Sequence, residues 1–306
     1  MNAIETQSLA LQSLVTDPPG TTYTYYTGGL IESATLPSPD ASGNIYYHYL
    51  NEDWNGQGRG RFDKSKRQTA LNGELAHTYI YYADATGYLQ TKNAYSNTTW
   101  ITLVTTYTYY NDTSNRMDSK TLVSSDSTGN FYYHYINEDW ASQGYGRVDK
   151  SKRKTALSGE LSHTYIYYAD VTGRLQTKNA YSDSSWTTLV VTYSYYNDTA
   201  NLMESKTRVS ADSSGNIYYH YINENWNSQG FGRVDKSKRL TASSGELSHA
   251  YGYYTDSTGR LQTKLAYSDA GWATLFATRS YYNDLTNRLE TKTLVNPDSS
   301  GNIYYH

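Results

Sequence analysis

Residues 43–67 read GNIYYHYLNEDWNGQGRGRFDKSKR, and the phrase returns as GNFYYHYINEDWASQGYGRVDKSKR at 129–153 and as GNIYYHYINENWNSQGFGRVDKSKR at 215–239. It starts again as GNIYYH at 301–306. Successive copies lie 86 residues apart, with no insertion or deletion between them. A fixed period of this kind is the sequence signature of an array in which each copy packs mainly against its neighbours.

The period divides the chain into a leader and a single repeat array. Residues 1–21 lack the repeat, and we expect them to be irregular or to form a short helix over 3–15 that ends before Pro18 and Pro19. The array covers residues 22–306: a partial copy at 22–43, full copies at 44–129, 130–215 and 216–301, and the start of a fourth copy at 302–306.

Each copy contains three related phrases that favour β-hairpins. In the second copy they are YYHYINEDWASQGYGRVDKSK, TYIYYADVTGRLQTK and TYSYYNDTANLMESK. Each phrase joins a Tyr-rich segment through a polar loop to a second segment that ends in Lys, and its side chains alternate as they do on strands. Six turns in each 86-residue copy predict six strands per copy and about 21 strands in all.

The sequence therefore predicts an all-β fold, an array of antiparallel β-hairpins that forms one long twisted sheet. Open sheets seldom exceed about ten strands without curling, because each strand pair adds twist. A sheet built from nearly identical units is expected to wind regularly. The sequence leaves open whether the result is a superhelical ribbon, a spiral or a shell.

Aspartate, glycine and asparagine in the hairpin loops are the residues expected to form the turns. In ADVTGRL, Asp170 is expected to accept hydrogen bonds from the backbone just after it, and Gly173 to take the left-handed conformation that closes the turn. In NDTANL, Asn201 replaces glycine, because asparagine tolerates that conformation next best. The turn-forming residues predicted in this way are Asp84, Gly87, Asp170, Gly173, Asp256, Gly259, Asn115, Asn201 and Asn287.

The composition explains how so polar a chain can fold. The 306 residues include 36 Tyr and carry a formal net charge of −3. A Tyr ring buries a large apolar area while its hydroxyl stays hydrated or finds a partner, so Tyr can replace aliphatic core residues in strands. The absence of Cys excludes disulfides and thiolate chemistry. The sequence contains no apolar run long enough to span a membrane, so we expect no membrane insertion. The near-neutral net charge disfavours nucleic acid as a partner.

The phrase YYADVTGRLQTK, with its relatives YYADATGYLQTK and YYTDSTGRLQTK, resembles the YD repeat of RHS-type proteins. In the first copy Tyr88 replaces the arginine of the motif, and in the TANL phrase Leu202 does so. The resemblance implies a strip of β-hairpins that winds into a hollow shell or spiral, in large bacterial surface and toxin proteins and in cell-adhesion proteins. The positions that match the motif are Tyr167, Asp170, Gly173, Arg174 and Leu175, and Tyr253, Asp256, Gly259, Arg260 and Leu261.

The histidines suggest neither a metal site nor an active site. Each YYHY histidine lacks a second ligand two residues further along its strand, whereas a structural metal site needs three or four convergent ligands. We expect these rings to stack in a ladder of tyrosines. Enzymes gather one constellation in one cleft, but these residues recur in every copy, so the sequence predicts no enzyme, no catalytic residue, no metal and no cofactor. The two periodic sets are His48, His134, His220 and His306, and His77, His163 and His249.

Acidic residues in NEDW and basic residues in GRVDKSKR predict ion pairs across the first hairpin. Glu138 or Asp139 is expected to face Arg147 or Lys150 on the partner strand. The alternative is a strip that binds polyanions, made of Lys64, Lys66, Arg67 and their equivalents.

Two tryptophans in each copy are candidates for contact with sugars. Aromatic rings flanked by Asn, Asp and Gln supply both an apolar face and hydrogen bonds. The alternative is that these rings fill the wide loops and the interior of the ribbon. The candidates for glycan stacking are Trp54, Trp100, Trp140, Trp186, Trp226 and Trp272.

Together these features predict a non-catalytic structural repeat scaffold of a large bacterial secreted or surface protein, which forms a shell if the sheet closes. The first alternative is a multivalent adhesive module that binds cell-surface glycans through its repeated aromatic rings. The second is a filament subunit that associates with itself, through edge strands or head to tail. The location expected in each case is extracellular or at the cell surface, reached by an export route that the sequence does not reveal.

Overall fold

The computed structural model describes residues 17–38, 43–71, 73–124, 129–157, 159–210, 215–243, 245–295 and 301–306. It divides into two compact units, Met1–Ala156 and Leu157–His306, and each is described by itself. The predicted helix over 3–15 lies outside the described residues. The first strand begins at Thr22, the residue at which the sequence places the start of the array.

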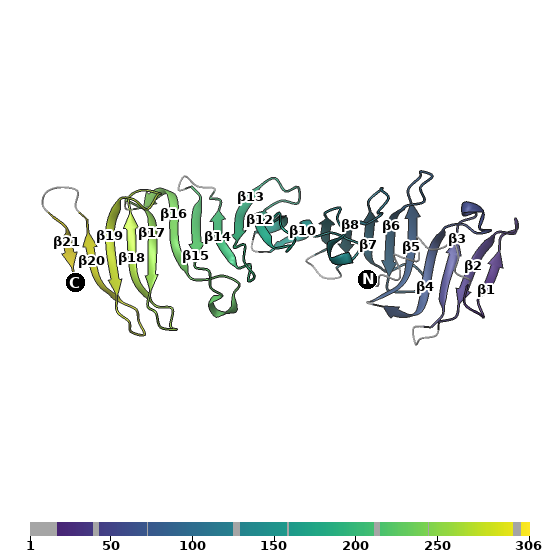
Figure 1. Cartoon of the computed structure of the whole chain (residues 1–306), viewed down its shortest axis with the longest axis horizontal. Coiled ribbons are helices and arrows are strands. Elements are labelled where there is room, and N and C mark those ends of the chain that lie inside the picture. Colours follow the sequence, from purple (N-terminus) through teal and green to yellow (C-terminus); the bar gives the residue numbers. More distant parts are fainter. Residues whose placement is uncertain are drawn as a thin grey trace. The chain divides into compact units, whose positions relative to one another are not determined.

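The described part of the first unit is a meander of ten strands, coloured purple to teal in Figure 1. Each strand pairs antiparallel with the next along the chain. The strands are β1 (Thr22–Tyr25), β2 (Ile31–Leu36), β3 (Ile45–Tyr49), β4 (Phe62–Leu71), β5 (Glu74–Tyr81), β6 (Leu89–Tyr95), β7 (Leu103–Tyr109), β8 (Met117–Leu122), β9 (Phe131–Tyr135) and β10 (Val148–Leu157), which ends at the boundary of the unit.

The second unit repeats the same meander with eleven strands among its described residues. Its strands also pair antiparallel in chain order. They are β11 (Glu160–Tyr167), β12 (Leu175–Tyr181), β13 (Leu189–Tyr195), β14 (Met203–Arg208), β15 (Ile217–Tyr221), β16 (Val234–Ser243), β17 (Glu246–Tyr253), β18 (Leu261–Tyr267), β19 (Leu275–Tyr281), β20 (Leu289–Leu294) and β21 (Ile303–Tyr305).

The predicted fold class is confirmed. The described residues form an all-β chain whose strands belong to one open antiparallel sheet of 21 strands. The first full copy supplies six of them, β3 to β8, as its six turns predict. The winding of the sheet into a ribbon, spiral or shell stays a prediction.

The strand register places most of the aromatic side chains on one face of the sheet. Tyr47 lies opposite Ser65, and Ser65 opposite His77. Further along, Lys92 lies opposite Tyr107. Because alternate residues share a face, these side chains lie on the same side, which we call the tyrosine face. On the opposite face Tyr46 pairs with Lys66, and Thr78, Asn93 and Thr106 continue the surface across β5, β6 and β7.

The core of the first unit lies on the tyrosine face and consists largely of tyrosine. Tyr49 is 5% exposed and packs with Phe62 and Ala34 in one cluster. Tyr107 is 4% exposed and packs with Met117 in another. The hydroxyl groups do not stay unsatisfied, since Tyr81, for example, donates to the Phe62 carbonyl oxygen at 2.8 Å. Ring burial combined with a satisfied hydroxyl is what lets tyrosine take the place of aliphatic residues here.

The wide NEDW loop contains one turn of 3-10 helix after the first strand of each copy. These turns are η1 (Trp54–Gly56), η2 (Trp140–Ser142) and η3 (Trp226–Ser228). Their second residues are left-handed, with φ between 49° and 55°. The loop thereby folds back over the strands and carries its tryptophan toward the next hairpin.

Candidate functional site

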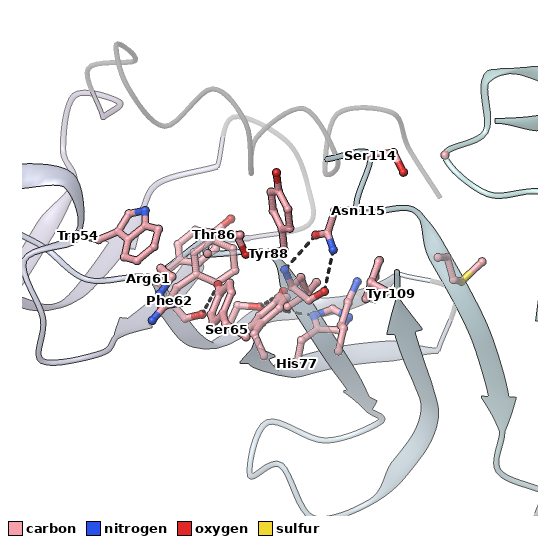
Figure 2. Close-up of a pocket in the computed structure, with 18 of the residues that line it drawn as sticks. Trp54, Arg61, Phe62, Ser65, His77, Thr86, Tyr88, Tyr109, Ser114 and Asn115 are labelled. Atoms are coloured by element: carbon pink, nitrogen blue, oxygen red, sulfur yellow. Dashed lines mark hydrogen bonds between the residues drawn. The ribbon is translucent and has the colours of Figure 1, made fainter. Parts of the chain in front are cut away.

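A hollow of about 390 Å³ lies on the tyrosine face of the first unit. Figure 2 shows Trp54 and Arg61 together on one side of this hollow, Asn115 on the other, and His77 between them. Its floor comes from β4, β5 and β6, and its rim from the wide loop and from the turns that follow β5 and β7. The wall mixes aromatic rings with side chains that can donate or accept hydrogen bonds.

A second hollow of about 320 Å³ lies at the corresponding place in the second unit. Seven of its nine lining residues stand two repeat periods after a lining residue of the first hollow. The hollow is therefore a property of the repeat rather than of one local sequence. The shared positions are Ile45, Tyr47, Ser65, Arg67, His77, Tyr79 and Lys92 in the first unit, and Ile217, Tyr219, Ser237, Arg239, His249, Tyr251 and Lys264 in the second.

A half-buried glutamate organises the polar side chains beside the first hollow. Glu74 accepts a hydrogen bond from the Tyr107 hydroxyl at 2.5 Å and lies 3.1 Å from Nε2 of His77. Burial raises the pKa of Glu74, but the hydrogen bonds from His77 and Tyr107 outweigh burial and hold this pKa below its usual value. Burial and the adjacent Glu74 carboxylate together raise the pKa of Tyr107 far above 10. The carboxylate is thus charged and the phenol neutral at physiological pH.

The third copy changes this network at one position. Tyr107 and its equivalent Tyr193 each donate to a glutamate, Glu74 or Glu160. At the same position of the third copy stands Arg279, whose guanidinium forms an ion pair with Glu246. The third copy therefore has a positive charge beside Lys264, because Arg279 is the partner of Lys264 in the strand register.

Histidine–carboxylate pairs recur on the opposite face of the sheet. His48 Nδ1 lies 2.5 Å from an oxygen of Asp63, and its ring meets Tyr26 edge to face at 6.3 Å. His134 contacts Asp149 in the same way, and its Nε2 lies 3.3 Å from Asp118. Each of these rings thus meets one tyrosine edge to face instead of stacking in a ladder of tyrosines, and the sequence does not reveal the carboxylate partner. Within the described residues, no group of three or more His, Asp or Glu has the arrangement of a metal site.

One tryptophan of each copy lies in the loop after the fourth strand of that copy and hydrogen-bonds to the third strand. In the first copy Trp100 donates from its ring nitrogen to the backbone carbonyl oxygens of Ser65 and His77, at 3.2 and 3.0 Å. The ammonium group of Lys66 lies 5.0 Å from the centre of the indole. Trp272 makes the equivalent contacts with the His249 carbonyl, at 2.9 Å, and with Lys238.

The other tryptophan joins its loop to the next hairpin. The Arg61 guanidinium lies 4.3 Å from the Trp54 ring and 4.8 Å from the Tyr81 ring, so the cation sits between two aromatic groups. The same guanidinium binds both carboxylate oxygens of Glu52, at 2.7 and 3.1 Å. A Cβ on Gly87 would lie only 2.3 Å from the Trp54 ring. The prediction that the tryptophans stack on glycans stays a prediction, and in the fold these rings join neighbouring hairpins.

The predicted ion pair of the first hairpin is confirmed for one of its candidate combinations. Arg147 binds Glu138 through two hydrogen bonds, at 2.7 and 3.0 Å. Asp139 instead accepts from the backbone of Gly144 at 2.9 Å and so closes the wide loop. A bidentate pair of this kind fixes geometry better than a single contact does.

The residues expected to form turns lie in turns. Asp84 accepts a hydrogen bond from the backbone of Thr86 at 3.0 Å, and Asp170 and Asp256 accept equivalent bonds. The glycines Gly87, Gly173 and Gly259 have φ between 69° and 72°. The asparagines Asn115, Asn201 and Asn287 have φ between 43° and 46°.

The turns also bind one another, which the sequence does not suggest. The Asn115 side chain accepts from the backbone N–H of Leu89 at 2.9 Å and donates to the Leu89 carbonyl at 2.8 Å (dashed lines in Figure 2). Asn111 donates to Asp84 of the preceding turn at 2.9 Å. An asparagine chosen for its backbone conformation therefore also holds two hairpins together.

Acid should loosen this row of turns. The pKa of Asp112 lies at about 2, below its usual 3.8, chiefly because the Ser114 hydroxyl and the Asn137 amide donate to it. A carboxylate with a depressed pKa stabilises the fold fully above its unfolded pKa, and this contribution is lost as the pH falls through the folded pKa. Between pH 3.8 and about 2, Asp112→Asn should therefore lose less stability than the unchanged protein in urea unfolding measurements. Equal losses in the two proteins would contradict this assignment.

The hollows offer aromatic surface, paired charges and hydroxyl groups, an arrangement suited to binding small polar molecules. Ser65 Oγ lies 3.4 Å from His77 Nδ1 and 3.0 Å from the Tyr79 hydroxyl. This serine is 5% exposed. A serine nucleophile must reach its substrate beside a set of oxyanion donors, so the burial of Ser65 favours a structural hydrogen bond.

No family model and no curated protein matches this chain. Among solved structures, the chain is similar to the pore form of the Photorhabdus luminescens Tc holotoxin carrying a TccC3 mutation, with 14% identity and a TM-score of 0.24, over 92% of this chain and 14% of that chain. It is also similar to TcdB2–TccC3 without its hypervariable C-terminal region, with 14% identity and a TM-score of 0.24, over 92% of this chain and 15% of that chain. The chain thus spans about one seventh of the length of these two.

A porin-like protein from Bacteroides uniformis is a third similar structure, with 11% identity and a TM-score of 0.23, over 93% of this chain and 100% of that chain. Among the described residues, no helix has the length and apolar character needed to cross a membrane.

Proposed function

We propose that this chain is a non-catalytic structural scaffold, a repeated β-hairpin array of a large secreted or cell-surface protein. Its twisted sheet would wind into a ribbon, a spiral or a shell. In this role the hairpins supply a stiff wall rather than a reaction centre, and the value of each copy lies in its contact with the next.

A recurring tyrosine tie is the observation that carries this proposal. In each unit the last tyrosine of a YY pair donates from its hydroxyl to a backbone carbonyl of the following hairpin. Tyr82 donates to Tyr109 at 2.5 Å, and Tyr110 donates to Tyr135 at 2.5 Å. The other examples are Tyr26 to Tyr49, Tyr168 to Tyr195, Tyr196 to Tyr221, and Tyr254 to Tyr281.

Tyrosine is the most distinctive residue of the repeat, and in each tie its hydroxyl group joins two hairpins. Each tie joins a hairpin to the one that follows it, and in the first copy two of the three hairpins supply such a donor, Tyr82 and Tyr110. Stability in arrays of this kind is a sum of terms from repeats and from the interfaces between neighbours. A chain whose repeated polar groups are engaged in such interfaces is suited to mechanical continuity.

Small-angle X-ray scattering and hydrogen exchange on the full chain test the scaffold. A scaffold should scatter as a rigid particle with a smooth, reproducible profile, and its backbone amides should show similar protection in all three copies. Scattering from a disordered coil, or from a compact two-lobed globule, would refute the proposed architecture. Proteolysis of intact producing cells would separately test exposure at the surface.

Glycan binding is the second candidate, and the hollow of the first unit, which Trp54 also lines, is the proposed place of contact. Its wall includes Tyr47, Tyr79 and Tyr109 together with amide and hydroxyl side chains. A volume of about 390 Å³ suits a short saccharide. Screening the full chain against a polysaccharide panel tests this candidate, and the variant Tyr109→Ala should weaken any binding in the hollow. Binding that survives Tyr109→Ala but is lost in Trp100→Ala would show that the glycan contacts Trp100 instead of the hollow.

A further inference from the structure

The hollow of the second unit contains a lysine in surroundings that the other copies do not reproduce. Lys264 lies on β18 between Tyr251 of β17 and Arg279 of β19 in the strand register. It lines the hollow of about 320 Å³ together with His249 and Arg239. Its side chain is half-buried, so the ammonium group is partly removed from water and still reachable through the hollow.

The equivalent lysines have a different neighbour. At the position of Arg279 the first two copies have Tyr107 and Tyr193, and these rings lie 5.5 and 5.3 Å from the ammonium groups of Lys92 and Lys178. In the third copy the ring is replaced by a second cation.

The glutamate near this lysine also has different partners in the second and third copies. In the second copy the ammonium nitrogen of Lys178 lies 3.9 Å from Glu160, whose carboxylate accepts from a neutral tyrosine. In the third copy the Glu246 carboxylate pairs with the Arg279 guanidinium, so much of its charge is already compensated. Lys264 therefore faces a carboxylate that holds another cation.

These surroundings favour the neutral amine. Burial lowers the pKa of Lys264, the nearby charge of Arg279 lowers it further, and Glu246 opposes both effects. Burial likewise lowers the pKa of His249, although its contact with Glu246 opposes the shift. The charged and titratable groups around Lys264 are Lys238 and Arg239 on β16, Glu246, His249 and Tyr251 on β17, and Arg279 on β19.

We propose that Lys264 is the nucleophilic amine of a covalent binding site for small aldehydes that carry an anionic group. A lysine beside another cation in a desolvated pocket is a known way to obtain a reactive amine. The cationic lining, with Arg239 and Lys238 in addition to Lys264, suits a carboxylate or phosphate on the ligand. The hollow limits the ligand to a molecule of roughly one or two rings.

The chemistry is a condensation that needs no oxidant or reductant. The lone pair of Lys264 Nζ attacks the carbonyl carbon and forms the N–C bond, while the carbonyl oxygen takes up a proton and becomes a hydroxyl. Nitrogen gives up two protons in all, one that matches the proton taken up by the carbonyl oxygen and one that protonates the hydroxyl, so that the C–O bond breaks, water leaves and the C=N bond forms. The products are the imine and one water molecule. His249, in the same hollow, is placed to exchange the protons that these steps move.

Pyridoxal 5′-phosphate is a suitable probe, because it combines an aldehyde with a phosphate. The full chain would be incubated with a limiting amount of the probe, reduced with borohydride to fix the imine, and digested for peptide mass spectrometry. Lys264 should be labelled several-fold more than Lys92 and Lys178, its internal controls. Pyridoxal without the phosphate should show a smaller preference for Lys264. Labelling of Lys264 no greater than that of the two controls would overturn the proposal.

Two exchanges between copies sharpen the test. Arg279→Tyr gives the third copy the residue of the other two, and should reduce the labelling of Lys264 several-fold. Tyr193→Arg gives the second copy the residue of the third, and should raise the labelling of Lys178. Circular dichroism would check that each variant is folded. If Arg279→Tyr does not fold, the Tyr193→Arg variant by itself tests whether the arginine makes the neighbouring lysine reactive. Unchanged labelling of Lys178 in that variant would contradict this role.

Discussion

Replacing Gly87 by alanine should lower the free energy of unfolding by about 2–5 kcal/mol. Two costs add at this position. The backbone is left-handed, with φ of 72°, which disfavours any side chain. The new Cβ would also lie 2.3 Å from the Trp54 ring, which the Arg61 guanidinium holds in place. The third copy repeats this geometry, since a Cβ on Gly259 would lie 2.3 Å from the Trp226 ring.

A matched glycine separates the two costs. Gly58 has φ of 70°, nearly the value at Gly87, but a Cβ there would meet no atom within 4 Å. Gly58→Ala should therefore cost only the backbone part, about 1–2 kcal/mol. The measurement is urea unfolding of the full chain followed by circular dichroism. Truncation of the ring in the double variant Gly87→Ala/Trp54→Ala should remove the steric part, so the two changes should be strongly non-additive. Equal losses for Gly87→Ala and Gly58→Ala would show that the ring moves aside freely.

Replacing Glu74 by leucine should destabilise the protein by roughly 2–4 kcal/mol. The change removes the acceptor of the Tyr107 hydroxyl and the partner of His77 Nε2. Both side chains are buried, Tyr107 at 4% and His77 at 6% exposure, so water cannot readily replace the lost acceptor. Groups that lose a buried partner bear their full desolvation cost.

A double-mutant cycle with Tyr107→Phe tests this network. If the Tyr107 hydroxyl matters mainly through Glu74, then removing both should cost less than the sum of the two single losses. The free energies would come from urea unfolding near neutral pH, where the depressed pKa of Glu74 keeps the carboxylate charged. As the pH falls below 4.5, the usual value for glutamate, and through the lower folded pKa, the unchanged protein should lose the stability that this charge supplies. Additive losses in the cycle would mean that Glu74 and Tyr107 act independently.

The hairpin array and its turns follow from local sequence, because the interactions that specify them are local. Alternating side chains define a strand, and an Asp followed by Gly or Asn defines a turn, whatever the strand later contacts. Because the sequence repeats every 86 residues, the same strand and turn patterns recur in each copy. For the same reason the ion pair of Arg147 with Glu138 could be predicted, since both residues belong to one hairpin.

The buried networks could not be predicted in this way. On a regular strand Glu74 and His77, three residues apart, point to opposite faces. They nevertheless meet at the start of β5, where its pairing with β4 is irregular between Lys66 and Leu71. The partner of Glu74 from further along the chain, Tyr107, arrives from a strand two removed from β5.

The sequence by itself determined the class of the fold, the number of strands in a copy and the residues that turn the chain. It did so because strand alternation and turn conformation are properties of a few consecutive residues. Only the tertiary structure decided what the aromatic and charged side chains contact. Trp54 reaches Gly87 and Asn115 reaches Leu89 across the gap between hairpins, and the place where such side chains land depends on the twist and register of the whole sheet.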